Sequence, residues 1–132
     1  MLFLILDVDC FKQINDIYGH AVGDIVLQKF GKLLKGTFRE GDILGRIGGD
    51  EFGVIMKNIQ TKDIAMKKAE ELLAKTQAYK IDELKGIIYS ISIGISTAPQ
   101  DGDCYMDLYK RADQALYQAK RSGKARVCNY FS

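Results

Sequence analysis

An uninterrupted apolar, β-prone segment opens the chain and constrains its fold more than any other feature. Residues 2–6 read Leu-Phe-Leu-Ile-Leu, and Asp7 and Val8 follow. Apolar side chains at both parities of a strand indicate that both of its faces are buried, so residues 2–8 are expected to form an interior strand. The segment is too short to span a bilayer and lacks the basic flank of a signal peptide.

The composition is that of one ordinary globular domain. The chain has 132 residues, is 47% hydrophobic and 27% charged, and contains one proline, which argues against disorder. A net charge of +2 provides no general attraction to nucleic acid or to an anionic membrane, so no nucleic-acid partner is expected. Cys10, Cys104 and Cys128 are widely spaced, which indicates reduced thiols and a cytoplasmic location.

Periodicity and turn residues predict the other elements. The predicted helices are a short one ending near residue 18 and longer ones over residues 21–38, 61–79 (with Thr61 as N-cap) and 105–121; the predicted strands are residues 42–47, 51–57, 86–96 and 126–131. Large and small side chains alternate in residues 86–96, so a neighbour should pack closely on the small face. The order β-α-α-β-β-α-β-α-β predicts an α+β fold, an α/β sandwich with a mostly antiparallel sheet flanked by helices, in a single domain over residues 1–132.

Four acidic residues lie at the ends of predicted strands. Asp7 and Asp9 follow the buried first strand, and Asp50 and Glu51 lie at the tip of a predicted hairpin. Carboxylates from two neighbouring strands are what Mg²⁺ needs in a phosphoryl-transfer site. An alternative stays open at this point, in which Asp9 caps the following helix and Asp50 serves ordinary turn chemistry.

Three motifs in order resemble the diguanylate cyclases. Residues 48–52 read GGDEF, residues 7–16 resemble the D-x-D-x-F-K-x-x-N-D motif, and residues 112–120 resemble A-D-x-A-L-Y-x-A-K. Gly19-His20 and Gly23-Asp24 follow at the expected spacing, and the resemblance runs from residue 2 to about residue 127. It implies an adenylyl-cyclase-like palm fold.

The resemblance also implies an activity. Two GTP molecules would condense into cyclic di-GMP and two pyrophosphates, with Mg²⁺ or Mn²⁺ bound and with each 3′-hydroxyl attacking the other α-phosphate across a homodimer. Cyclic di-GMP would be product and feedback inhibitor, and an upstream sensory domain, which could tether the full-length protein to a membrane, is expected. The alternative is a catalytically silent module that binds GTP or cyclic di-GMP, but the retained acidic residues favour the enzyme.

By the same resemblance, the metal ligands would be Asp7, the carbonyl of Val8, and Asp50. Asp50 would also accept the proton of the 3′-hydroxyl, and Glu51 is the next candidate, as a second metal ligand or base. Gly48 and Gly49 lack side chains, so substrate can lie against the hairpin backbone.

Other matched residues would bind the nucleotide. Asn15 and Asp24 would recognise guanine, because a carboxylate accepts from N1–H and the 2-amino group together, and His20 would line the same pocket. The phosphate candidates are Lys12, Lys120, Lys124 and the backbone amides of Cys10 and Phe11. Without the resemblance, Asp24 and these lysines would be interpreted as solvated surface.

Arg39 and Asp42 fit the R-x-x-D product-inhibition site of the family. The alternative is an exposed salt bridge at a helix exit, and the partner arginine is not identifiable, Lys67 and Lys68 being candidates. The family's usual N-terminal helix and D-x-L-T-G-L-x-N-R segment are missing, so the chain is expected to be truncated. Lys124 stands where Arg is common, and Ala125 where Asn is usual.

Overall fold

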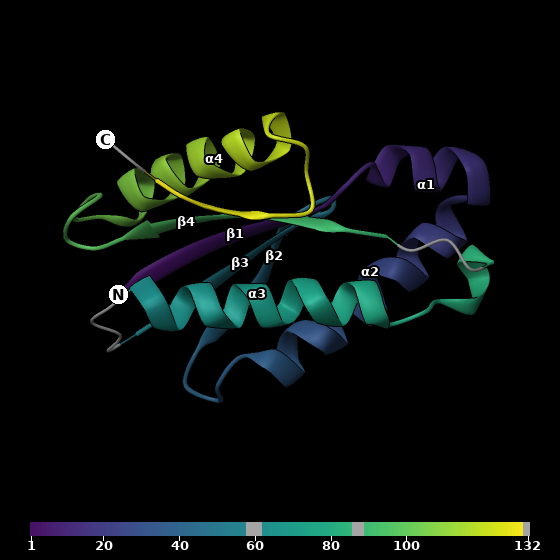
Figure 1. Cartoon of the computed structure of the whole chain (residues 1–132), viewed down its shortest axis with the longest axis horizontal. Helices are drawn as coiled ribbons and strands as arrows, with labels where there is room; N and C mark the ends of the chain where they lie inside the picture. Colours follow the sequence, from purple (N-terminus) through teal and green to yellow (C-terminus); the bar gives the residue numbers. More distant parts are fainter. Residues whose placement is uncertain (58–61, 86–88, 131–132) are drawn as a thin grey trace.

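The computed structural model describes residues 1–57, 62–85 and 89–130 (Figure 1). Its element order confirms the predicted α+β arrangement, with a short 3₁₀ helix added before the fourth strand. The elements are β1 Leu2–Val8, α1 Phe11–Tyr18, α2 His20–Thr37, β2 Ile43–Gly48, β3 Glu51–Met56, α3 Lys62–Ala78, η1 Asp82–Leu84, β4 Ile91–Thr97, α4 Tyr105–Arg121 and β5 Val127–Asn129.

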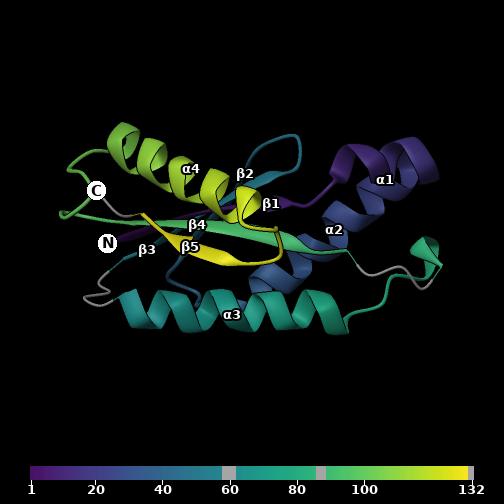
Figure 2. The ribbon, with the colours of Figure 1, turned by 45° about the horizontal axis from the view of Figure 1, so that its top comes forward.

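The five strands form one sheet in the order β2-β3-β1-β4-β5. Every pair is antiparallel except β4 and β5, which are parallel. Helix α4 lies on one face of the sheet and helices α2 and α3 on the other, while α1 lies beyond one end (Figures 1 and 2). Strand β1 is therefore interior and covered on both faces, as its apolar sequence predicts.

Alternate side chains of β1 pack into two different hydrophobic clusters. Leu2, Leu4 and Leu6 belong to the larger cluster, which includes residues of α2 and α3. Phe3 and Ile5 pack instead against the apolar side chains of α4. Since side chains alternate along a strand, Asp7 continues the parity of Phe3 and Ile5 and faces α4.

The small face of β4 receives α4 at close range, which confirms the expectation from its alternating sequence. A Cβ on Gly94 would overlap backbone atoms of Ala112 and Leu116, so only glycine allows this approach. The hydroxyl of Ser96 donates to the carbonyl of Leu108 at 2.7 Å and fixes the same contact. The helix is thus seated directly on the sheet backbone.

Strand β4 is shorter at its start than the predicted strand. It begins at Ile91, and the contact between the two chain segments continues one residue beyond it, where the carbonyl of Ser90 accepts the N–H of Asp9 at 2.9 Å. Residues 86–88 of the predicted strand, the N-cap Thr61 and Phe131 lie outside the described residues.

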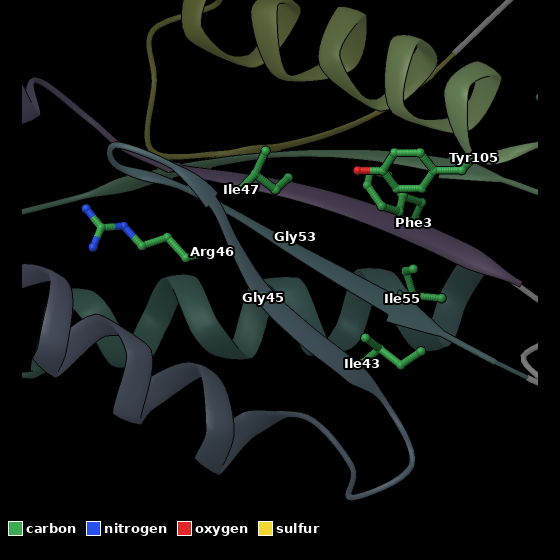
Figure 3. Close-up of a pocket in the computed structure, with 8 residues that line it drawn as sticks. All are labelled: Phe3, Ile43, Gly45, Arg46, Ile47, Gly53, Ile55 and Tyr105. Atoms are coloured by element: carbon green, nitrogen blue, oxygen red, sulfur yellow. The ribbon is translucent and has the colours of Figure 1, made fainter.

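Helix α4 contacts β1, β4 and β5, so β2 and β3 expose an apolar groove on this face. The groove has a volume of about 320 Å³, and Figure 3 shows Phe3 beside the ring of Tyr105 and Ile43 beside Ile55, with Arg46 directed away from them. In the part of the chain that the structure describes, no helix is both long and apolar enough to cross a membrane.

Candidate active site

Asp7 and Asp50 come together where β1 ends beside the β2–β3 hairpin. The N–H of Val8 donates to the carbonyl of Asp50 at 3.4 Å, which ties the hairpin tip to the end of β1. The Asp50 carboxyl lies near enough to Asp7 to raise the pKa of Asp7. The hairpin turns at Gly49, whose φ of 48° is a left-handed conformation that favours glycine. A Cβ on Gly48 or Gly49 would meet nothing within 4 Å, so this backbone is open to a ligand.

Lys120 joins this pair from the last turn of α4. Its ammonium forms an ion pair with Oδ2 of Asp7, which is only 8% exposed. The pKa of Asp7 is raised to about 7: burial is the largest cause and the neighbouring Asp50 also raises it, while Lys120 acts in the opposite direction. The ammonium therefore compensates only part of the cost of burying this charge.

The residues present fit a divalent cation. Oδ1 of Asp7 is buried and has no hydrogen-bond partner among the residues described, so it retains free lone pairs. Residues 1–57, 62–85 and 89–130 contain no ready-made group of three or more His, Cys, Asp or Glu side chains for a metal. Two carboxylates and a backbone carbonyl suit Mg²⁺, which usually takes its remaining ligands from water and substrate phosphates.

Glu51 is hydrogen-bonded to Tyr109, a residue outside the sequence motifs. Its Oε1 accepts a hydrogen bond of 2.7 Å from the hydroxyl of Tyr109 on α4. Tyr109 lies on the mainly apolar face of its helix, so its pattern predicts core packing and gives no sign of a polar partner.

Asp9 does not cap α1, so that alternative is wrong. The N-cap of α1 is Cys10, and no side chain caps this helix. Asp9 instead accepts hydrogen bonds from the hydroxyls of Ser90 and Ser92, each at 2.6 Å, and from the N–H of Ala125 at 3.0 Å. All of these donors join Asp9 to distant parts of the chain. In the sequence, the small side chains on one face of the predicted strand 86–96 were the sign that Ser90 and Ser92 have a close neighbour.

The loop after α4 brings Lys124 to the start of α1. Its ammonium donates to the Sγ of Cys10 at 3.0 Å, and this hydrogen bond raises the pKa of Lys124. Gly123, Lys124 and Ala125 all have positive φ, and the left-handed φ of 51° at Ala125 is one that asparagine tolerates better. Lys124, Cys10 and the first amides of α1, beginning with Phe11, therefore lie together.

Asn15 and Asp24 lie near each other across the α1–α2 pair. Asn15 packs over Gly23, the neighbour of Asp24, where a Cβ would overlap Oδ1 of Asn15. That Oδ1 is buried without a hydrogen-bond partner among the described residues. Asp24 is exposed and lines a pocket of about 400 Å³; the other lining residues are Leu27, Gln28, Arg46 and Phe52. Lys12 on α1 and His20 at the start of α2 are exposed.

Arg39 and Asp42 are not part of this cluster. The guanidinium of Arg39 donates to Oδ1 of Asp42 at 3.2 Å and to the carbonyl of Lys57 at 3.0 Å. The backbone N–H of Arg39 donates to Oδ2 of Asp42 at 2.9 Å. They precede β2, whose six residues separate them from the hairpin tip by about 20 Å. The two residues form a distinct site at the other end of β2.

The pKa of Asp7 predicts how stability depends on pH in the absence of metal. The pKa of about 7 in the folded state exceeds the ordinary value of 3.8, so folding favours the neutral form of Asp7. The contribution of this group to the free energy of unfolding is therefore lost as the pH rises from 3.8 to about 7. We expect Asp7→Asn to become progressively more stable than the wild type from about pH 4.5 to about pH 7, with a constant difference above that pH. The measurement is urea unfolding in EDTA buffer.

Asp103→Asn, which changes an exposed loop carboxylate, is the matched control and should show no such trend. A stability difference between Asp7→Asn and wild type that stays flat over this range would contradict the raised pKa.

Comparisons with known proteins identify the family of the chain. The family model described as "Diguanylate cyclase, GGDEF domain" matches residues 1–126. The chain is 41% identical over 125 residues to diguanylate cyclase A of Treponema denticola, covering 94% of this chain and 33% of that protein. It thus spans about a third of the length of this curated relative.

Two solved structures are similar to the chain as a whole. The GGDEF domain of TpbB from Pseudomonas aeruginosa superposes with a TM-score of 0.93 at 35% identity, covering 98% of this chain and 76% of that one. The GGDEF domain of DgcB from Caulobacter crescentus, in complex with c-di-GMP, has a TM-score of 0.88 at 26% identity, covering 97% of this chain and 76% of that one. Fold, motifs and family model agree, and the chain belongs to the diguanylate cyclase GGDEF domain family.

Proposed function

We propose that this chain is the catalytic domain of a diguanylate cyclase, which condenses two GTP molecules into cyclic di-GMP and two pyrophosphates. The observation that carries the proposal is that the N–H of Val8 bonds the carbonyl of Asp50 and so brings Asp50 to the end of β1, where an oxygen of Asp7 lacks a hydrogen-bond partner among the described residues. Family membership supports the class of reaction.

The cation, Mg²⁺ or Mn²⁺, is proposed to bind the carboxylates of Asp7 and Asp50 and the carbonyl of Val8. When bound, it supplies positive charge against the α-phosphate and the leaving pyrophosphate. Lys120 is paired with Asp7 in this structure. With a cation on Asp7, the ammonium of Lys120 would be free to bind a phosphate oxygen, and Lys124 and the first amides of α1 would bind others.

The chemistry requires two copies of the domain, because each copy holds one GTP. Each 3′-hydroxyl gives up its proton, with Asp50 as the proposed acceptor, and its oxygen bonds to the α-phosphorus of the facing GTP. The bond from that phosphorus to the β-phosphate oxygen breaks, and pyrophosphate leaves. We propose that a regulatory region outside this chain controls homodimerisation. The chain covers only 33% of the curated relative, so the relative has further sequence that can contain such a region.

Guanine specificity is proposed to come from Asn15 and Asp24. The carboxylate of Asp24 is exposed in its pocket and can accept from the N1–H and 2-amino groups of guanine. Adenine offers neither donor, so it would leave the carboxylate without its partners. The buried Oδ1 of Asn15, without a hydrogen-bond partner in the described chain, is available to a second donor.

Forced dimerisation tests the proposed activity. We expect the chain, fused to a parallel dimeric coiled coil and supplied with GTP and Mg²⁺, to produce cyclic di-GMP, measured by chromatography and mass spectrometry. Asp50→Asn removes a metal-binding carboxylate and should lower the rate about 100-fold or more. Asp113→Asn, which alters an exposed carboxylate of α4, should leave the rate unchanged.

A fusion that binds GTP and yields no product would contradict the cyclase proposal and favour the silent nucleotide-binding module. Equal loss of activity in the Asp50 and Asp113 variants would show that the effect is not specific to the site.

A product-binding role for Arg39 and Asp42 is the second proposal. Supporting it, the guanidinium of Arg39 is 48% exposed although it bonds Asp42, so a ligand can reach it. Arginine can bind phosphate or stack on guanine, and Asp42 can accept from a guanine edge. The similar DgcB domain was crystallised with c-di-GMP, which supports a search for such a site here.

Calorimetric titration with cyclic di-GMP measures this role. Arg39→Ala should bind the dinucleotide at least about tenfold more weakly than the wild type, because a charged bidentate contact is lost. Arg111→Ala on α4 is the control and should bind normally. Equal affinity of the Arg39 variant and the wild type would remove the proposed product site.

A further inference from the structure

The hydroxyl of Tyr109 bonds Glu51, and its ring packs in a cluster of three aromatic rings with Phe3 and Tyr105. The hydroxyl donates to Oε1 of Glu51 at 2.7 Å. The ring lies 6.2 Å from that of Phe3 on β1 and 6.1 Å from that of Tyr105, between centroids. Because the aromatic neighbours restrict the ring, the hydroxyl is held toward the carboxylate before any ligand arrives.

Tyr109 and Lys120 act on neighbouring carboxylates from one side of the same helix. They are eleven positions apart, which is about three turns, so they project from the same side of α4 and are separated by about 16 Å along its axis. Their acceptors, Glu51 and Asp7, are direct partners in the antiparallel register of β3 and β1. Helix α4 therefore fixes both acidic side chains at the end of the sheet.

The two donors have different electrostatic effects. The ammonium of Lys120 offsets the charge of Asp7, whereas a phenol fixes the carboxylate of Glu51 and leaves its negative charge in place. A phenolic hydroxyl is uncharged and a hydrogen-bond donor at neutral pH. A negative charge held in one orientation on the strand partner of Asp7 strengthens the attraction of this end of the sheet for a cation.

We propose that Tyr109 is a positioning residue for the divalent-cation site: its hydroxyl holds the carboxylate of Glu51, the direct strand partner of Asp7. The inference rests on the proposed function, because it assumes that these acids bind a cation. Groups that hold metal-site carboxylates in place contribute strongly to affinity, and their removal commonly costs about 10- to 100-fold.

Binding of Mn²⁺ alone tests the proposal without any catalytic turnover. Free Mn²⁺ is counted by its electron paramagnetic resonance signal as the ion is titrated into the protein. Tyr109→Phe keeps the ring and its packing and removes only the donor, so we expect Mn²⁺ affinity to fall about tenfold. Tyr105→Phe, in the same aromatic cluster and 51% exposed, is the matched control and should bind as the wild type does.

A second background shows whether Tyr109 acts through Glu51. In the Glu51→Gln protein the charge that Tyr109 orients is absent, so adding Tyr109→Phe should change Mn²⁺ affinity less than twofold. This double-mutant comparison separates a positioning role from a general packing role, which would cost the same in both backgrounds.

Four results would overturn the inference: no Mn²⁺ binding by the wild type, wild-type affinity in Tyr109→Phe, an equal loss in Tyr105→Phe, or an undiminished loss in the Glu51→Gln background. A dimeric fusion that makes no cyclic di-GMP, while Mn²⁺ affinity still depends on Tyr109, would refute the proposed function alone. Cyclic di-GMP synthesis with Mn²⁺ affinity independent of Tyr109 would refute this inference alone.

Discussion

The direct seating of α4 on the backbone of β4 is the contact on which the polar site depends. Gly94 lets the backbone of Ala112 and Leu116 approach closer than any side chain would permit. With the helix at that depth, Lys120 reaches Asp7 at one end of the site and Tyr109 reaches Glu51. A bulkier residue at position 94 would lift the helix, and both donors would move with it.

Burial of Asp7 creates an electrostatic cost that links fold to function. The alternation of β1 puts leucines in one core, phenylalanine and isoleucine in the other, and directs Asp7 to the face of α4. There its carboxyl meets Asp50, and its pKa rises to about 7 mainly because it is buried. A cation that binds both carboxylates relieves this cost, so the folded chain is prepared for a charged ligand.

The sequence predicted the strands and their faces well, because side-chain periodicity reflects which face of an element is buried. The both-face burial of residues 2–8 and the close neighbour on the small face of β4 follow from that periodicity. The bonds from Ser90 and Ser92 to Asp9 join residues 81 and 83 positions apart, and that from Tyr109 to Glu51 spans 58 positions. Such contacts depend on the register between distant elements, which local patterns do not contain.

We propose that the ends of β1 and β3, together with α4, form a divalent-cation site for a nucleotide. The most direct measurement is a crystal structure with Mn²⁺ and a non-hydrolysable GTP analogue, with the metal located by its anomalous scattering. We expect the Mn²⁺ peak between Asp7 and Asp50, the ammonium of Lys120 on a phosphate, and the carboxylate of Glu51 still bonded to Tyr109. Mn²⁺ bound away from Asp7 and Asp50, with Lys120 still paired to Asp7, would contradict the claim.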